Sequence, residues 1–288
     1  MPVHDDLGTR MKEYYENIPK TKLMRRTPVI IRIDGKAFHT FTRSFVKPFD
    51  RILMESMQET MKYLCENIQG CVLGYAQSDE ITLVLVDYKE LNSSAWFDYE
   101  VQKLCSISAS MATMAFNRIF AQKVDEFGRN NCPGYDEGGY DPNSITDEEK
   151  NAILLVQTYC RAIDKGAMFD ARCFNIPKEE VTNLIYWRQL DATRNSIQMV
   201  GQANFSHNEL QNKNCNMIQD MLHENKGINW NDFPTDCKRG SCCIKELYVP
   251  KKASLADTPR SHWIIDTEIP IFKGEDREYI EELIKIGE

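Results

Sequence analysis

The chain has 288 residues and a net charge of −8, and 42% of its residues are hydrophobic. This length suffices for one large domain or two smaller ones. No stretch approaches the ~20 apolar residues that a membrane span needs. The polar, acidic start, Met1-Pro-Val-His-Asp-Asp6, does not resemble a signal or transit peptide. We therefore expect an intracellular protein, in the cytoplasm and without a membrane partner. The negative charge argues against coating of nucleic acid but leaves room for a local basic patch that grips RNA.

The ten cysteines are scattered along the chain, and several lie in apolar runs where reduced thiols pack as small hydrophobes. Cys237, Cys242 and Cys243 cluster near basic residues but lack the Cys-x-x-Cys pairs of structural zinc sites. We expect neither a disulfide framework nor zinc, and the sequence assigns this cluster no role.

The first elements predict a helix followed by a buried strand. Residues 5–19 carry apolar side chains at helical spacing, which predicts an N-terminal helix that packs on a sheet. Residues 28–35 are a β-branched run bounded by Pro28 and Gly35, and this pattern is typical of a central strand. The strand delivers Asp34 at its end, and Gly35 then permits a close backbone approach or a positive φ. An irregular loop is expected up to Pro48.

The next elements predict a crossover helix and a hairpin. Asp50 is a candidate N-cap for a helix over about 51–67, whose apolar residues recur every three or four positions. The apolar segments 71–76 and 81–86 flank Gln77-Ser78-Asp79-Glu80 and predict a β-hairpin. A helix between strands suits a crossover onto the same sheet. We therefore predict an α+β fold, with an antiparallel sheet of the polymerase-palm or ferredoxin-like type flanked by helices.

The remaining pattern alternates helices, loops and short strands. We predict a long helix over 97–123, a Gly/Pro/Asn-rich loop over 127–145, and a helix from a capping box at Thr146 to about Asp164. A strand over 168–177 leads into a helix from Lys178 to about 196, in which Trp187 is expected to anchor the core. Later elements are short helices near Leu210 and over 217–222, a packed loop at Trp230 and Phe233, strands over 242–249 and 263–265, and a terminal helix over 275–286.

These elements divide the chain into three parts. Residues 1–127 form the palm core with the carboxylates, and residues 128–166 form a loop–helix insertion. Residues 167–288 are expected to complete the palm and to add elements for ligand binding and for oligomerisation.

Two carboxylates stand at the ends of apolar strands. If the hairpin lies beside the Asp34 strand, Asp34 and Asp79 converge at one rim of the sheet. Hard divalent cations need such oxygen ligands, and two ions about 4 Å apart can serve phosphoryl transfer. Each motif alone is more often a plain turn. Their joint occurrence favours a site.

Five short stretches of the sequence occur in an order that matches one known family. They are similar to the tRNA-His guanylyltransferase family, the reverse (3′→5′) polymerases, over roughly residues 5–250. The stretches are Arg32-Ile-Asp-Gly-Lys-Ala-Phe-His39, Lys47-Pro-Phe-Asp50, Gly74-Tyr-Ala-Gln-Ser-Asp-Glu80, Phe169-Asp-Ala-Arg172 and Tyr186-Trp-Arg-Gln-Leu-Asp191.

One departure from the family pattern points to a branch. Eukaryotic members that add the extra guanosine to tRNA-His carry Asp-Cys-His-Ile-Asn-Asn after Trp-Arg-Gln. Here the segment reads Asp191-Ala-Thr-Arg-Asn-Ser196, with Thr193 in place of that histidine. The chain therefore resembles the guanylyltransferase-like branch, whose members repair truncated tRNA 5′ ends.

The resemblance implies the site residues. Two Mg²⁺ ions would be held by Asp34, the Gly35 carbonyl and Asp79, with Glu80 as a third catalytic carboxylate. The nucleotide would be bound by Gly35, Lys36, Ala37, Phe38, His39, Lys47, Asp50 and Ser78. A second nucleotide or the tRNA end would be bound by Lys103, Arg188, Gln189, Arg194 and Asn195. Away from the family motif, His39, Lys103 and Asp50 equally fit packing, surface and capping roles.

The resemblance also implies the reaction. ATP would adenylylate the tRNA 5′ end, and the 3′-hydroxyl of GTP or another nucleotide would then attack it, in template-dependent repair by a homotetramer. Guanosine addition to tRNA-His alone stays open. So do a nucleotide cyclase or a forward polymerase with the same palm, and a non-catalytic RNA-binding palm protein. The retained Asp34, Asp79 and Glu80 argue against the last.

Overall fold

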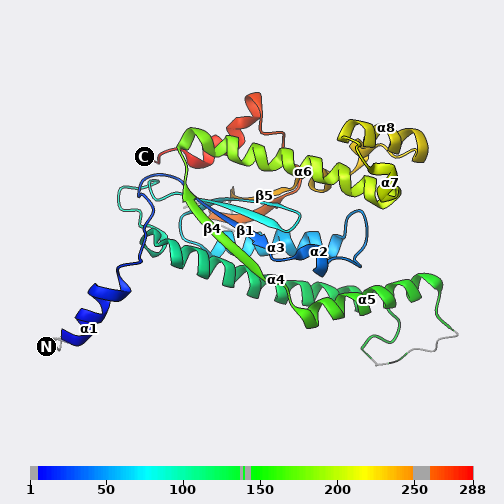
Figure 1. Cartoon of the computed structure of the whole chain (residues 1–288), viewed down its shortest axis with the longest axis horizontal. Coiled ribbons are helices and arrows are strands. Elements are labelled where there is room, and N and C mark those ends of the chain that lie inside the picture. The colour runs from blue at the N-terminus through cyan, green and yellow to red at the C-terminus, as the bar shows by residue number, and fades with distance from the viewer. Residues whose placement is uncertain (1–5, 137–138, 140–143, 249–259, 288) are drawn as a thin grey trace, which may run out of the picture.

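The computed structural model describes residues 6–136, 139, 144–248 and 260–287, and one antiparallel sheet organises them (Figure 1). Neighbouring strands pair in the order β4-β1-β3-β2-β5-β6. The predicted α+β fold is confirmed, and strand order 4-1-3-2 is that of the ferredoxin-like palm. The strands are β1 (Val29–Gly35), β2 (Cys71–Gln77), β3 (Glu80–Leu85), β4 (Phe169–Asn175), β5 (Ser241–Tyr248) and β6 (Arg260–Asp266).

Helices cover both faces of this sheet, which explains the continuous β-branched run in β1. Ile31 and Ile33 point towards α3 (Arg51–Asn67) and α4 (Val101–Asn131) on one face. Ile30 packs in a second cluster under α6 (Val181–Asn204) and the C-terminal helices (Figure 1). A strand buried on both faces has no reason to alternate apolar and polar residues.

The capping signals in the sequence correspond to real helix starts. The Asp50 carboxylate accepts a hydrogen bond from the Leu53 N–H at 3.0 Å and begins α3. Thr146 and Glu149 form a reciprocal capping box at the start of α5 (Asp147–Lys165), which packs along α4. These two predictions are confirmed. Within the predicted loop up to Pro48, a short helix, α2 (Phe38–Phe41), forms instead.

Several boundaries differ from the prediction. The helix expected over 97–123 begins at Val101 and extends to Asn131, so the predicted loop over 127–145 starts later. The expected terminal helix is broken into three short pieces. The short elements are η2 (Trp96–Tyr99), η3 (Lys178–Glu180), α7 (His207–Leu210), α8 (Cys215–Lys226), η4 (Trp230–Asp232), α9 (Thr235–Arg239), η5 (Gly274–Arg277), α10 (Glu278–Glu281) and η6 (Glu282–Ile284). In the described part of the chain, no helix has the length and apolarity to cross a membrane.

The prediction that the N-terminal helix packs on the sheet was wrong. Helix α1 (Asp6–Met11) continues into η1 (Lys12–Glu16), and the pair projects away from the body of the molecule (Figure 1). Its apolar side chains, such as Leu7 and Tyr14, are 59% and 64% exposed. The physical reason is that α3, α4 and α6 already fill both faces of the sheet, so the amphipathic stripe finds no surface there.

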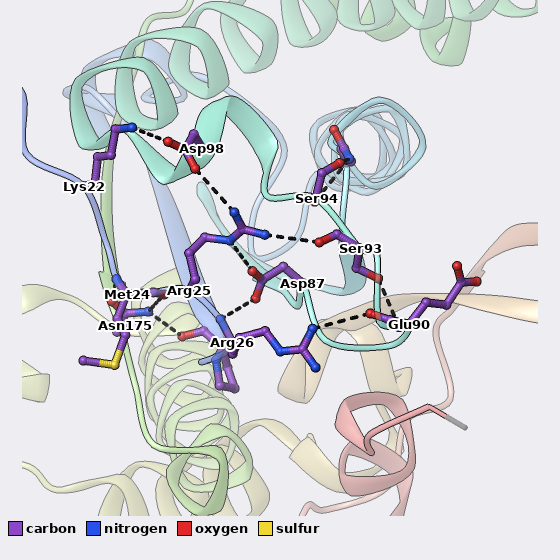
Figure 2. A network of polar contacts seen from close by, with 12 residues as sticks. Lys22, Met24, Arg25, Arg26, Asp87, Glu90, Ser93, Ser94, Asp98 and Asn175 are labelled. Atoms are coloured by element: carbon purple, nitrogen blue, oxygen red, sulfur yellow. Dashed lines mark hydrogen bonds and ion pairs between the residues drawn. The ribbon is translucent and has the colours of Figure 1, made fainter.

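A polar network anchors the segment between this projecting helix and β1 (Figure 2). The carboxylate of Asp87, which follows β3 and is buried, accepts hydrogen bonds from Arg25 Nε at 2.5 Å and from the Arg26 N–H at 2.8 Å. The Asn175 side chain accepts one from the Met24 N–H at 2.7 Å. This network closes the end of the sheet opposite Asp34, because Asp87 lies beyond Leu85, the partner of Val29.

Replacement of the buried Asp87 tests whether this network anchors the segment. Asp87→Ala leaves the Arg26 N–H without its acceptor and removes the Arg25 Nε bond, although the Arg25 guanidinium keeps Asp98 and the Ser93 carbonyl. We expect a loss of about 2–4 kcal/mol in the free energy of unfolding. Glu90→Ala, in the same loop, removes an exposed side chain and should change it by less than about 0.5 kcal/mol. Urea denaturation measures both, and equal effects would contradict the anchoring role.

Candidate active site

The sheet brings the two predicted aspartates to one rim. Asp34 ends β1 and stands opposite Glu80 in the β1–β3 register. The Gly35 N–H donates a hydrogen bond to the Asp79 carbonyl at 3.0 Å, which fixes the β2–β3 turn against the end of β1. Ser78 in this turn has a φ of 51°, a left-handed conformation that costs energy in a non-glycine residue and that functional sites often retain. The prediction that the hairpin lies beside the Asp34 strand is confirmed.

The Asp79 carboxyl has a raised pKa and forms no ion pair with lysine or arginine among the described residues. Burial is the largest influence and raises the pKa of the Asp79 carboxyl, and the charge of Asp34 raises it further. Hydrogen bonds from its own backbone and from the Ser78 hydroxyl, which lies 3.0 Å away, lower it in part, as does His39. Within the described residues, neither Asp34 nor Asp79 forms an ion pair with lysine or arginine. Two such carboxylates are the donors that Mg²⁺ accepts when phosphates and water complete its shell.

Glu80, unlike the two aspartates, is held in an ion pair with arginine. Its carboxylate accepts hydrogen bonds from Arg188 Nε at 2.7 Å and from Arg188 Nη2 at 2.9 Å, and Arg32 Nε lies 3.5 Å away. Burial raises the pKa of Glu80, and Arg188 and Arg32 lower it. Glu80 is thus held in an ion pair, and the described residues contain no group of three acidic, histidine or cysteine side chains that could hold a metal.

The backbone after β1 offers donors for an anion. The N–H groups of Gly35 and Lys36 are used within the protein, by Asp79 and by the Met168 carbonyl at 2.8 Å. The next three N–H groups, of Ala37, Phe38 and His39, donate to no acceptor in the described part of the chain. Ala37 has a φ of 55°, which turns the chain sharply at this point. Three unpaired N–H groups beside two carboxylates suit a metal-bound phosphate.

An aromatic cluster holds this loop in place. The Phe38 ring packs against Phe41, Phe116 and Phe169 at centroid distances of 5.1–5.6 Å. A Cβ at Gly35 would lie 2.3 Å from the Phe38 ring, so only glycine allows β1 to end against it. Phe38 therefore serves the site through its backbone while its side chain belongs to the core.

A narrow cavity of about 80 Å³ opens beside Ser78, between α3, α6 and α9. Asp50 and Asn195 lie in its wall, as do the flexible side chains of Met54 and Met199. The Asp50 carboxylate is already occupied, since it accepts hydrogen bonds from two backbone N–H groups and from the Tyr159 hydroxyl at 2.6 Å. Asp50 thus shapes the cavity through the structure it fixes.

The structure does not bring every predicted residue to this rim. Gln189 is buried, and its amide bonds the Pro270 carbonyl at 2.7 Å and the Phe272 N–H at 3.1 Å, which ties the C-terminal segment to α6. Lys103 lies at the opposite end of the sheet, 3.7 Å from Glu100.

The other basic and polar candidates are exposed or partly so. Lys36, His39 and Lys47 are exposed on the loop that follows β1. Arg194 is exposed and pairs with Asp191 on the preceding turn of α6.

Sequence reasoning missed the role of Arg32 and mistook that of Trp187. Trp187 is 51% exposed, so the prediction of a core anchor was wrong. Arg32 and Arg188 lie against its ring, at 5.9 and 4.6 Å from the centroid. Arg32 is on the same sheet face as Asp34, two residues away along β1, and its buried Nε has no hydrogen-bond partner within the described part of the chain. A charged residue inside an otherwise apolar strand was the available signal.

Comparisons with known proteins agree with this geometry. The sequence profile of the tRNAHis guanylyltransferase (Thg1) family matches residues 8–177. The chain belongs to the tRNAHis guanylyltransferase family. It is therefore a nucleotidyltransferase of the tRNA guanylyltransferase-like type.

Relatives of this family support the assignment over the full length. A bacterial tRNA(His) guanylyltransferase-like protein in complex with ATP is 40% identical, with a TM-score of 0.75, and the match covers 98% of this chain and 100% of that one. Its complex with GTP gives 39% identity and a TM-score of 0.71 over 97% and 99% of the two chains. The tRNA(His) guanylyltransferase of Saccharomyces cerevisiae is 24% identical over 76% of this chain and 82% of its own.

The raised pKa of Asp79 gives a stability prediction. Its ordinary pKa in the unfolded chain is about 3.9, so the folded state loses stability as the pH rises above that value. At pH 7 without divalent ions, Asp79→Asn should raise the Tm by roughly 2–4 °C, the shift that about 1 kcal/mol produces in a chain of this size. The difference in Tm between Asp79→Asn and the wild type should become smaller as the pH falls towards 4. Added Mg²⁺ should raise the Tm of the wild type more than that of the variant.

Differential scanning calorimetry checks this prediction, with Asp164→Asn on the exposed side of α5 as the control. A lower Tm for Asp79→Asn than for Asp164→Asn at pH 7 would show that the ionised carboxylate stabilises the fold, against the inference.

The buried ion pair between Glu80 and Arg188 gives a second stability prediction. Arg188→Met removes both hydrogen bonds to the buried Glu80 carboxylate and leaves only the more distant Arg32 beside it, so it should cost about 3–5 kcal/mol of unfolding free energy. The double variant Glu80→Gln/Arg188→Met should recover much of this loss. Arg194→Met, which removes an exposed pair on the same helix, should cost about 1 kcal/mol or less. Urea denaturation of the four proteins decides, and no recovery in the double variant would rule out the charge explanation.

Proposed function

We propose that this protein adds nucleotides to the 5′ end of tRNA in the 3′→5′ direction. The single observation that supports this most is the pairing of β1 with β3. It brings Asp34 and Asp79 to one rim beside three N–H groups that find no acceptor among the described residues. An oxygen of the tRNA 5′-monophosphate attacks the α-phosphorus of ATP, and pyrophosphate leaves. The 3′-hydroxyl of the incoming nucleotide then attacks the activated 5′ phosphate, and AMP leaves.

The residues at the rim fit a pair of magnesium ions. Asp34, the Gly35 carbonyl and Asp79 would hold them, since Mg²⁺ in phosphoryl-transfer sites takes one or two carboxylates and fills its shell with phosphates and water. Bound there, the ions would lower the pKa of the attacking hydroxyl and neutralise charge on the leaving oxygens.

The chain's own side chains and backbone then do the positioning. The N–H groups of Ala37, Phe38 and His39 bind the triphosphate, and Arg32 contributes positive charge next to Asp34. The cavity beside Ser78 takes the base, because its methionine side chains can move apart to admit a flat ring. Glu80 acts by orienting Arg188 and Arg32. No nucleophilic serine or cysteine is needed, since both steps are displacements on phosphorus.

Repair of truncated tRNA is the role we favour. Thr193 stands where the enzymes specific for tRNA-His have histidine. Identity to the bacterial guanylyltransferase-like protein is 40%, against 24% for the yeast enzyme. Both comparisons support the guanylyltransferase-like branch. Guanosine addition to tRNA-His alone is the second candidate, and sequencing of products separates the two.

Replacement of Asp34 and Asp79 tests the proposed activity. With tRNAs that lack one or two 5′ nucleotides, ATP and all four nucleotides, we expect the wild type to restore the missing residues. Asp34→Asn and Asp79→Asn should each lower the rate by at least about 100-fold, because removing one charge-stabilising group in such a site costs that much or more. Asp164→Asn should retain the full rate.

Sequencing of the new 5′ ends gives the readout, and thermal melts show that the variants are folded. Wild-type rates in either rim variant would overturn the metal assignment. Addition of a single guanosine to tRNA-His alone would favour the second candidate.

A further inference from the structure

A cavity of about 570 Å³ lies at the far half of α6, where α7 and α8 pack against it. Its volume is within the range of small-ligand sites, and it is larger than the cavity beside Ser78. Neither the metal rim nor the triphosphate loop uses it. Figure 1 shows α7 and α8 at the same end of the molecule as α2.

The cavity has an apolar floor and an amide rim. Phe205, Leu210 and Ile218 form the floor. Gly201 lets α8 approach, since a Cβ there would lie 2.8 Å from Ile218. Three exposed glutamines line the wall, and their amides form no hydrogen bond with any described residue; they are Gln198, Gln202 and Gln211.

A polar stripe on α6 connects this cavity to the active site. Arg188, Asp191, Asn195, Gln198 and Gln202 are spaced by three or four residues and therefore lie on one side of the helix. Arg188 bonds Glu80 at the rim, Asn195 lines the cavity beside Ser78, and the glutamines line the far cavity. The eleven positions from Asp191 to Gln202 span about 16 Å.

The lining favours an unpaired base over a bare anion. Amides present donors and acceptors that match the edges of bases, and unstacked bases of single-stranded RNA are read in this way beside aromatic and apolar side chains. Lys213 and His207 are the basic residues of the wall, enough for one backbone phosphate and too few for a triphosphate.

We propose that this cavity binds an unpaired nucleotide of the RNA strand opposite the 5′ end that is extended. The inference rests on the proposed function, since a tRNA whose 5′ end lies at Asp34 and Asp79 carries its single-stranded 3′ end past that rim. The stripe on α6 leads this strand to the cavity, and the contact would hold the end of the acceptor stem in register.

Binding of two RNA hairpins tests the proposal. One has a blunt acceptor stem and the other ends in four unpaired 3′ nucleotides; both are labelled with fluorescein and titrated at one salt concentration without nucleotides. We expect the wild type to bind the overhang hairpin about tenfold or more tightly. Gln198→Ala/Gln202→Ala should reduce this ratio to about one. Both changes are at exposed helix positions, where alanine does not weaken the helix.

The matched control is Gln102→Ala/Gln122→Ala, two exposed glutamines on α4, which should keep the wild-type ratio. Cross-linking from 4-thiouridine in the overhang gives the position, and we expect the modified peptide within residues 198–218. An equal affinity of the wild type for the two hairpins, an unchanged ratio in Gln198→Ala/Gln202→Ala, or cross-links only elsewhere would overturn the proposal. The nucleotide-addition assay is separate: its failure with a normal overhang preference would reject the proposed function and leave the cavity assignment standing.

Discussion

Pairing of β1 with β3 is the constraint on which the rest of this structure depends. It sets Asp34 against the β2–β3 turn, so that two carboxylates 45 positions apart in the chain share one edge. It also fixes the first residues after β1, because Gly35 is bonded to the turn and Phe38 is locked among aromatic rings. If β1 slipped by one residue against β3, Asp34 would point into the apolar face under α3 and α4, and Ile33 would point towards α6. Arg32 and Asp34, which the slip would bury on the apolar face, oppose it, as does the bond from the Gly35 N–H to the Asp79 carbonyl.

The charges around this edge fall into two groups with different tasks. Asp34 and Asp79 form no ion pair with lysine or arginine among the described residues, which fits the cation that we propose there. Glu80 is balanced by Arg188, and that pair is buried under α6. A buried pair of this kind adds little net stability but requires one arrangement of its partners. Here it determines how α6 sits over the edge, and therefore where the cavities along α6 lie relative to the aspartates.

The sequence predicted the palm and its carboxylates because these depend on local signals. Strand length, the caps at Asp50 and Thr146, and the polar turn at Ser78 are each readable within a few residues. The N-terminal helix was misplaced because amphipathic spacing shows that a helix has an apolar side and not which surface covers it.

Trp187 was misjudged, and the bonds of Gln189 and Asp50 were not foreseen, for a related reason: burial and hydrogen-bond partners come from segments far along the chain. Gln189 is held by Pro270 and Phe272, and Asp50 by Tyr159, and no local pattern announces such pairs. Arg32 was visible as a charge inside an apolar strand, but its neighbours Glu80 and Trp187 were not.

The hydroxyl of Tyr159 joins two regions that the sequence had set apart. Tyr159 belongs to α5, within the segment 128–166 that reads as an insertion, yet it bonds the residue that begins α3 and packs edge-on against Phe45 and Phe120. Removing α5 to make a smaller enzyme would open the aromatic cluster and take away the Tyr159 bond to the Asp50 carboxylate. Helix α5 thus supports the start of α3 and the aromatic cluster, and a minimal version of this fold has to include it.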